Sequence, residues 1–349
     1  MLNKFGLSVL LNLLIKNFCR AVDAHVNILI FLKFIRLPFT LCLVMKAAVI
    51  SNIVLDHIQD SLGNTIARSL GGPACYCSLT ARKFNFDTTL VTKVGSDFSS
   101  DNKQVLAASG IDIKQNQIVQ NYPTTTFRIR LKKDQRDLFL YSRCQQLGYE
   151  DFNGIDADCW IVSPVLDELP IKLIVDVIKN SNEIDFILLD PQGYLRTVNS
   201  SGEVLITGIS KLDFPMITAI KVNEREQSEL THGLRGVEAM RSLQTSMRIR
   251  FVILTENYRV HLLYGDTHYW LNIPYIDTLD NTGAGDILSA AFTCSYLKEK
   301  DPLWAICFGG GAVRAALETK LLGLSKVPAK SKIENCATYY YNTISFETL

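Results

Sequence analysis

The chain has 349 residues, of which 48% are hydrophobic and 20% are charged, and its formal net charge is +1. This composition is typical of a globular protein with a substantial core, and the length allows one large α/β domain or two smaller domains. Because proteins that bind nucleic acid normally carry a basic surface, the balanced charge and the lack of a long basic run argue against that class.

The first 44 residues form an apolar extension that charged residues interrupt. A membrane-spanning helix needs about 20 largely apolar residues, but the stretch 27–45 contains Lys33, Arg36 and Pro38. Three interpretations stay open for residues 1–44: a membrane or interfacial anchor, a partner-binding extension, and sequence upstream of the true start. We favour the last, because Met45 opens a segment typical of the first buried strand of an α/β domain. A membrane partner is therefore not expected.

From residue 46 onward, short apolar runs alternate with helical stretches. The runs are continuously apolar and partly β-branched, as expected of strands buried on both faces. They lie at 47–50, 160–162, 186–189, 216–220 and 251–254. Helical stretches such as 171–179 and 236–243 lie between several of them. This order predicts an α/β fold with a mostly parallel central sheet and helices on both faces, in a domain that spans 45–345.

Two segments depart from this pattern and predict a small second sheet. Residues 57–70 are typical of a hairpin around 61–64, and residues 124–141 alternate apolar and polar side chains on both sides of a polar turn. Alternation indicates a sheet with one wet face. We predict a β-sheet lid with segments at about 57–70 and 122–146. The edges of an exposed sheet often pair with a second copy, so a homodimer through the lid is one assembly to test.

The nine cysteines contain no C-x-x-C pair. Their odd number and their positions in apolar stretches predict free thiols in the core rather than a disulfide framework. Such thiols are typical of a reducing compartment, so we expect a cytoplasmic protein. The five histidines form no H-E-x-x-H motif, and a zinc site is therefore not supported.

The strongest functional pattern is Asp-Asn-Thr-Gly-Ala-Gly-Asp at 280–286, which leads into an apolar helical stretch. Main-chain N–H groups at a helix start favour an anion, and phosphoryl transfer needs such donors where charge builds up. We therefore expect Gly283, Ala284 and Gly285 to form an anion hole. The carboxylate of Asp286 is placed to accept a proton from an attacking hydroxyl and to aim that hydroxyl. The alternative is an ordinary turn in which Asp286 caps the helix.

This heptad resembles the D-T-T-G-A-G-D signature of the ribokinase family of carbohydrate kinases, also called the phosphofructokinase-B family, from which only Asn281 differs. Five further motifs of the family occur in the same order between residues 45 and 333. They are the first-strand segment 51–56, the glycine pair at 71–72, V-G-x-D at 94–97, a strand ending in D-P at 189–192, and K-x-N-x-x-E at 221–226. The resemblance implies a ribokinase-like fold and a kinase that moves the γ-phosphate of ATP onto a hydroxyl of a sugar or sugar-like small molecule.

On the acceptor side, the resemblance implies that Asp56 hydrogen-bonds substrate hydroxyls, while Gly71 and Gly72 let the backbone approach the substrate. Taken without the family, Asp56 is a turn former at a strand end and the glycines form a tight turn. Where many sugar kinases have Asn, this chain has Tyr76, whose ring could stack on an apolar face of the substrate or simply pack in the core. Tyr76 suggests an archaeal-type sugar, inositol or nucleoside kinase subgroup.

On the donor side, the resemblance implies ATP and Mg²⁺ as cofactors and also allows a monovalent cation. Asn223 and Glu226 would hold the Mg²⁺ through water, because hard oxygen ligands suit that ion. Thr255 and Thr282 would lie beside the nucleotide. Taken without the family, Asn223 and Glu226 are two exposed polar residues at a helix start.

One departure from the family lies after Thr255. The family usually has a G-x-x-G turn there, but this chain has Asn257 and Val260 at the glycine positions. Val does not tolerate a left-handed backbone, so we expect a rebuilt nucleotide loop. The departure keeps open a ribokinase-fold ligand-binding regulatory protein without turnover, although the intact heptad favours a kinase. The lack of G-x-G-x-x-G and of a P-loop argues against a dinucleotide-dependent oxidoreductase and a P-loop NTPase.

Overall fold

The fold is taken from a computed structural model that describes residues 44–131, 136–181, 184–208, 212–256, 258–278 and 280–349. The apolar extension predicted at the N-terminus lies outside these residues, apart from Val44. The tip of the second lid hairpin, 132–135, and Asn257 lie outside them as well. Within the described part, none of the helices combines the length and the apolar character needed to cross a membrane.

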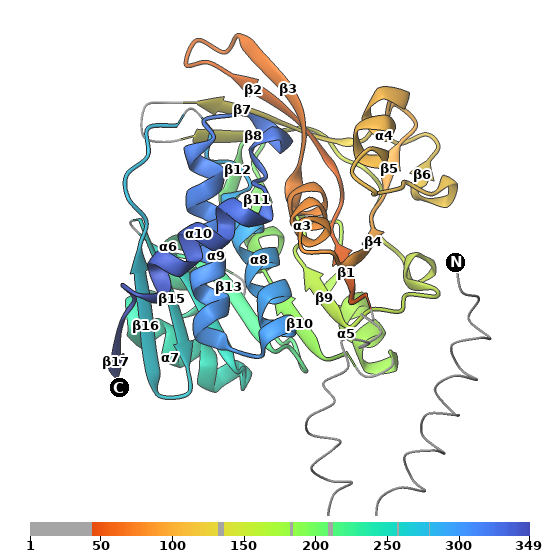
Figure 1. Cartoon of the computed structure of the whole chain (residues 1–349). Coiled ribbons are helices and arrows are strands. Elements are labelled where there is room, and N and C mark those ends of the chain that lie inside the picture. The colour runs from red at the N-terminus through yellow and green to blue at the C-terminus, as the bar shows by residue number, and fades with distance from the viewer. Residues whose placement is uncertain (1–43, 132–135, 182–183, 209–211, 257, 279) are drawn as a thin grey trace, which may run out of the picture. The chain divides into compact units, whose positions relative to one another are not determined.

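A nine-stranded sheet forms the centre of the domain (Figure 1). From one edge to the other its strands are β17 (Ser345–Thr348), β16 (Thr267–Asn272), β15 (Arg259–Tyr264), β14 (Phe251–Glu256), β13 (Ala219–Asn223), β10 (Phe186–Leu189), β9 (Cys159–Val162), β1 (Lys46–Ile50) and β4 (Asp87–Val91). The strands from β14 to β4 pair in parallel, whereas β14 to β17 pair antiparallel. The prediction of a mostly parallel central sheet is confirmed.

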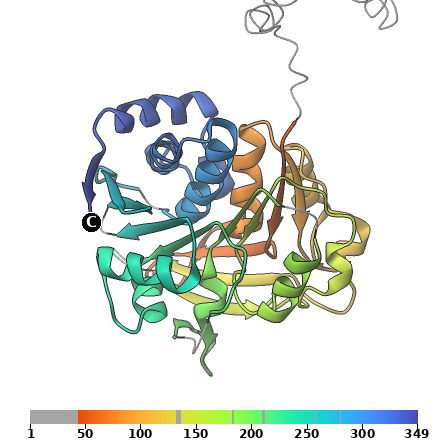
Figure 2. The same ribbon diagram turned by 90° about the horizontal axis from the view of Figure 1, so that it is seen from below.

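Helices cover both faces of this sheet because alternate residues of its parallel strands enter two separate cores (Figure 2). Ala47 and Val49 belong to the first core, whereas Ala48 and Ile50 belong to the second. The first core also contains residues of α3 (Gly72–Lys83), α8 (Ala284–Glu299), α9 (Pro302–Glu318) and α10 (Lys330–Tyr341). The second contains residues of α5 (Ile171–Asn180) and α7 (Gly236–Met247). Strands buried on both sides explain why their sequences are continuously apolar.

A second, four-stranded sheet stands apart from the main one and confirms the predicted small sheet (Figure 1). In spatial order its strands are β3 (Thr65–Gly71), β2 (Val54–Gln59), β7 (Thr125–Leu131) and β8 (Arg136–Ser142). Phe127 and Ile129 are buried with Val54 and Val165, while Arg128 between them is exposed and lies over the ring of Tyr141. The alternating pattern of β7 therefore separates an inner apolar face from a wet outer face.

Shorter elements complete the described residues. They are α4 (Ser100–Ala107), α6 (Glu224–Leu230), the strands β5 (Val94–Gly95), β6 (Ile118–Val119), β11 (Arg196–Val198) and β12 (Val204–Ile206), and the 3₁₀ turns η1 (Gln115–Gln117), η2 (Tyr149–Phe152), η3 (Pro191–Leu195) and η4 (Gly323–Lys326). Every cysteine in the described part is a free thiol, and all but Cys336 are buried, as expected of core packing.

One strand was predicted with the wrong start. The apolar run 216–220 predicted a strand, but β13 begins only at Ala219. Met216 has a φ of +69° and its side chain is 66% exposed, so it belongs to the turn that precedes the strand. A left-handed residue cannot continue a β-strand, and composition alone did not reveal the turn.

Candidate active site

A single cleft of about 630 Å³ receives residues from both sheets. Its walls come from β2, β7 and β8 of the small sheet, from the ends of β13 and β14 and the segments that follow β10, β13 and β14, and from residues 274–278, 281–283, 285 and 286. Of the site residues predicted from the sequence, the cleft is lined by Asp56, Gly72, Asn223, Glu226, Thr255, Thr282, Gly283, Gly285 and Asp286. Gly71, Ala284 and Tyr76 lie outside its lining.

The heptad 280–286 forms the entry to α8. Gly283 precedes the helix with a φ of +78°, and a Cβ at this position would lie 2.5 Å from ring atoms of Tyr76. The first bond of the helix runs from the N–H of Ile287 to the carbonyl of Gly283, at 2.9 Å. The N–H groups of Gly285 and Asp286 precede that bond, as is general at a helix N-terminus. Only glycine combines this backbone with the close ring below it.

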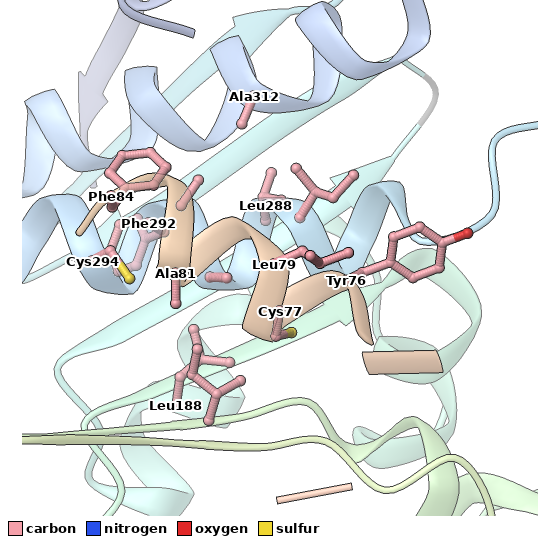
Figure 3. Close-up of a cluster of buried hydrophobic side chains, with 14 of the residues drawn as sticks. Tyr76, Cys77, Leu79, Ala81, Phe84, Leu188, Leu288, Phe292, Cys294 and Ala312 are labelled. Carbon is pink, nitrogen blue, oxygen red and sulfur yellow. The ribbon is translucent and has the colours of Figure 1, made fainter. Parts of the chain in front are cut away.

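Ala284 and Tyr76 are placed differently from the other predicted residues. The N–H of Ala284 donates to the carbonyl of Asn281, at 3.3 Å, within the loop itself. Tyr76 is 1% exposed and belongs to the first core, and Figure 3 shows its ring at the margin of that cluster, with Leu79 and Leu288 nearby. This burial fits the alternative of core packing and does not fit direct stacking on a substrate.

Asp56 lies where the small sheet meets the start of α3. It is 4% exposed and pairs in register with Ser69 across β2 and β3. A Cβ at Gly71 would overlap Asp56 Oδ2, so the glycine leaves the space that the carboxylate fills. Gly72 follows with a φ of +77°, close to the carbonyl of Asn52. The glycine pair thus seats an acidic side chain at the beginning of a helix, where the dipole favours negative charge.

Lys221 is a site residue that the sequence analysis did not select. Its Nζ lies 3.0 Å from Asp190 Oδ2, and both residues are buried. Burial opposes the charge of Lys221, but the carboxylates of Asp190, Glu226 and Asp286 outweigh it and raise the pKa of the ammonium. A Cβ at Gly285 would lie 2.8 Å from Nζ, so this cation faces the start of α8 directly.

The pairing of Lys221 with Asp190 follows from the register of neighbouring parallel strands. Leu189 of β10 pairs with Ile220 of β13, so the next residues along each strand stand side by side. The two motifs D-P and K-x-N-x-x-E were visible in the sequence. To predict that Asp190 and Lys221 are in contact, one must also know that β10 and β13 are neighbours in the sheet.

Gln192 and Arg196 form a second arrangement that sequence reasoning missed. Arg196 Nη2 donates to Gln192 Oε1 at 2.7 Å, and its Nη1 donates to the carbonyl of Val165 at 2.9 Å. Because a guanidinium has only donors, this contact fixes which end of the Gln192 amide is the oxygen. Gln192 Nε2 therefore points to Ser163 Oγ at 3.1 Å and to Asp286 Oδ1 at 3.5 Å. Gln192 thus restrains the orientation of Asp286.

Asn223 and Glu226 close the donor side of the cleft at the start of α6. Asn223 Oδ1 accepts the N–H of Glu226 at 3.0 Å, and Glu226 Oε2 accepts the N–H of Asn223 at 2.9 Å. Glu226 is 3% exposed, so the expectation of two exposed polar residues is wrong for it. Burial raises the pKa of Glu226, with Lys221 acting in the opposite direction.

These two side chains offer an oxygen-only donor set, which fits Mg²⁺ held through water. Among the residues that the structure describes, no group of three or more His, Cys, Asp or Glu side chains could hold a metal ion. A sparse protein shell of this kind suits Mg²⁺, which keeps several waters and binds substrate phosphates.

The segment after Thr255 is a tight hairpin. Glu256 of β14 pairs with Arg259 of β15, and Tyr258 between them has a φ of +62°. Val260 pairs with Thr255 inside the hairpin and is 2% exposed. Val260 therefore lies in a strand and needs no left-handed backbone, while Tyr258 takes the left-handed position. The expectation of a rebuilt nucleotide loop stays a prediction.

Asp280, the first residue of the heptad, is bound to a buried cation from a distant segment. Lys326 of η4 places its Nζ 2.6 Å from Asp280 Oδ2 and 2.9 Å from the carbonyls of both Asp280 and Thr282. Asp280 Oδ1 accepts the N–H of Thr282 at 2.8 Å, and Oδ2 accepts that of Gly323 at 3.0 Å. Although burial opposes its charge, Lys326 lowers the pKa of Asp280.

Comparison with known proteins identifies a family and solved structures that resemble this chain. The sequence matches the family described as pfkB family carbohydrate kinase over residues 45–328. No curated protein sequence matches the chain. A pyrophosphate-dependent kinase of the ribokinase family, complexed with a pyrophosphate analog and myo-inositol, has a TM-score of 0.68 at 18% identity, covering 83% of this chain and 99% of its own.

Two further solved structures are similar. The ribokinase of Thermotoga maritima has a TM-score of 0.66 at 19% identity, covering 84% of this chain and 99% of its own. The nucleoside kinase of Methanocaldococcus jannaschii has a TM-score of 0.63 at 15% identity, with the same coverage of 84% and 99%. At these identities the likeness establishes the shared fold.

Proposed function

Because this chain belongs to the pfkB family of carbohydrate kinases, we propose that it transfers the γ-phosphate of ATP to a hydroxyl of a sugar-like small molecule, with Asp286 as the general base. One observation carries the proposal: Asp56, Asp286 and the glycines of the 283–285 loop line the same cleft. An acceptor held by Asp56 and a phosphoryl group held at the start of α8 would therefore share one chamber with a carboxylate.

In the proposed step, the acceptor oxygen bonds to the γ-phosphorus while the bond from that phosphorus to the bridging oxygen of ADP breaks. The hydroxyl proton passes to the carboxylate of Asp286, which Gln192 restrains through the contact at 3.5 Å. Since the hydroxyl becomes acidic only as the new bond forms, aiming the nucleophile is as large a part of this role as accepting the proton.

The charge that builds on the phosphoryl group is met by groups fixed around the start of α8. The N–H groups of Gly285 and Asp286 precede the first bond of the helix, and Gly283 supplies the turn that exposes them. Ala284 donates within the loop, so we leave it out of the anion hole. The ammonium of Lys221 faces Gly285 and adds a full positive charge in a buried environment, where electrostatic stabilisation is strong.

Mg²⁺ would be held through water by Asn223 and Glu226, where it neutralises phosphate charge. Thr255 and Thr282 line the same donor side of the cleft. Lys221 lies between this side and α8, which gives the donor phosphates positive charge at both ends.

The donor is proposed to be a nucleotide rather than pyrophosphate. Tyr258 and Tyr275 line the cleft, are 62% and 72% exposed, and pack edge to face at 5.7 Å between ring centroids. Exposed aromatic rings beside a phosphate site suit a stacked nucleobase, for which pyrophosphate has no counterpart. The pyrophosphate-dependent kinase of similar fold makes this distinction worth testing directly.

The acceptor is proposed to be a neutral cyclic polyol or a nucleoside. The apolar side chains that line the cleft on the side of Asp56 include Val54, Phe127 and Ile129 of the small sheet and Val165 of the segment after β9. The basic residues of β7, Arg128 and Arg130, alternate along the strand with the apolar residues of this inner face. An apolar wall with one carboxylate recognises hydroxyls on a molecule that has an apolar face, and it disfavours a phosphorylated sugar. Closure of the small sheet over that acceptor would keep water from the phosphoryl group.

The test is a panel of sugars, cyclic polyols and nucleosides, each incubated with Mg²⁺ and either ATP or pyrophosphate. We expect ADP to form only when one class of acceptor is present, and ³¹P NMR to show the new phosphate ester. The Asp286→Asn variant is the matched control. If acceptors bind by calorimetry but no donor is consumed, the chain is instead a ribokinase-fold regulatory protein.

A further inference from the structure

Lys326 is a fully buried cation that does not line the cleft. Its residue is 0% exposed, and it lies on η4, 46 positions along the chain from Asp280. Three oxygens surround its ammonium at 2.6, 2.9 and 2.9 Å, namely a carboxylate oxygen of Asp280 and the main-chain carbonyls of Asp280 and Thr282. A primary ammonium has three N–H donors, and each of these oxygens can accept one of them.

This environment is the one that a dehydrated monovalent cation would need. Carbonyl oxygens and one carboxylate converge on a single positive charge, and the carboxylate balances that charge. A potassium ion placed among the same oxygens would lie within a few ångströms of Nζ, where like charges repel strongly in a buried environment. The residues present therefore do not fit a monovalent metal ion at this loop, because Lys326 already occupies the place.

The contacts also reach the catalytic loop. Asp280 accepts the N–H groups of Thr282 and Gly323, so one carboxylate joins η4 to the heptad. Thr282, whose carbonyl Lys326 holds, directly precedes Gly283, the left-handed residue that starts α8. A shift of the Thr282 carbonyl would turn the next peptide and with it the N–H groups of the anion hole.

We propose that Lys326 is a built-in cation that replaces a bound monovalent metal ion in holding the 280–285 loop in its phosphate-binding conformation. Lys326 is thus a positioning residue, and the protein needs no potassium. The effect on turnover rests on the proposed kinase function, whereas the effect on the loop does not.

The experiment uses the full chain and compares Lys326→Met with Lys330→Met. Methionine reproduces the lysine stem as far as Cε and leaves a space the size of the ammonium group. Lys330 lies four residues away at the start of α10, and its side chain is 41% exposed. Thermal unfolding and turnover are measured in sodium, potassium, ammonium and choline chloride at equal ionic strength.

For the wild type and Lys330→Met we expect the same melting temperature and the same turnover in all four salts. For Lys326→Met we expect turnover about 10²-fold lower in choline, mainly through kcat, because the loop is displaced. Ammonium or potassium should restore at least a tenth of the lost rate and raise its melting temperature by about 3 °C or more.

Two results would overturn the proposal: activation or stabilisation of the wild type by potassium over sodium, or a Lys326→Met protein that matches the wild type in choline. If Lys326→Met does not fold in choline, its recovery from cells or by refolding in ammonium chloride supports the proposal, and failure in every salt contradicts it. Because thermal unfolding can be measured without an acceptor, the stability measurements still test the proposal if no kinase activity is found.

Discussion

Gly71→Ala gives a sharp test of Asp56 as the group that binds the acceptor. The backbone at Gly71 is extended, with φ −152°, so alanine adds no backbone strain. Its Cβ would overlap the carboxylate of Asp56, which is 4% exposed and has little room to move. The substitution therefore displaces one functional side chain while leaving the loop 280–286 untouched.

The expected magnitude follows from the hydrogen bonds that Asp56 would lose. A hydrogen bond to a charged group is worth about 1.5–3 kcal/mol, which corresponds to about 10- to 10²-fold in kcat/KM for the acceptor. The KM for ATP should stay within about twofold, since Asp56 lies on the small sheet whereas Thr255 lies on β14 and Glu226 on α6. The added methyl group should also cost about 1–3 kcal/mol of stability, which thermal unfolding will show.

Gly148→Ala is the matched control. Gly148 is also extended, with φ −120°, and its added Cβ would likewise meet a carboxylate, that of Glu150. The side chain of Glu150 is 69% exposed and can swing into solvent, so this variant should keep normal kinetics. If Gly71→Ala retains acceptor kcat/KM within twofold of Gly148→Ala while both are folded, Asp56 does not bind the acceptor.

Three further outcomes are expected. Asp286→Asn should bind ATP normally by calorimetry and lose turnover by about 10²-fold or more, and normal turnover would contradict its role as the base. His261 is buried against His268, and burial above all lowers its pKa to about 4, below the unfolded value near 6.5. Its neutral form therefore stabilises the fold above pH 6.5, and urea unfolding should show a loss of about 2 kcal/mol between pH 7 and 5 that His261→Phe abolishes. Removal of residues 1–44 should leave a folded, active enzyme, and an insoluble or inactive product would show that the extension belongs to the domain.

Much of the fold could be predicted because buried parallel strands have a distinctive composition. The runs at 47–50 and 186–189 are apolar throughout, and each proved to be buried on both faces. The small sheet was predictable for the opposite reason, since alternation in β7 separates an inner from an outer face. The error at 216–220 arose because an apolar Met216 sits in a turn, which composition cannot distinguish from a strand.

Only those parts of the candidate site that lie within one short segment of the sequence could be predicted. Residues 280–286 show a loop, a helix start and a carboxylate within one short stretch. The partners that orient them come from elsewhere in the chain: Gln192 follows β10, Lys221 lies on β13, and Lys326 is on η4. Their contacts depend on strand order and on how η4 returns to the heptad, and no local pattern reports either. The sequence left the place of Tyr76 open for the same reason, because Gly283, whose backbone lies against its ring, is distant in sequence.

The placement of the two buried lysines explains how a nearly neutral protein can hold a triphosphate. Lys221 lies in the cleft and faces the start of α8, whereas Lys326 lies outside the cleft lining and binds the loop that leads into it. Each is matched by a buried aspartate, Asp190 or Asp280, so neither adds to the overall charge. The protein thus places one ammonium, that of Lys221, against the start of α8 where the phosphoryl group needs a donor, without raising its net charge. It follows that the two lysines are not interchangeable: loss of Lys221 should weaken donor binding and slow the chemical step at any salt, whereas loss of Lys326 should be relieved by a small cation.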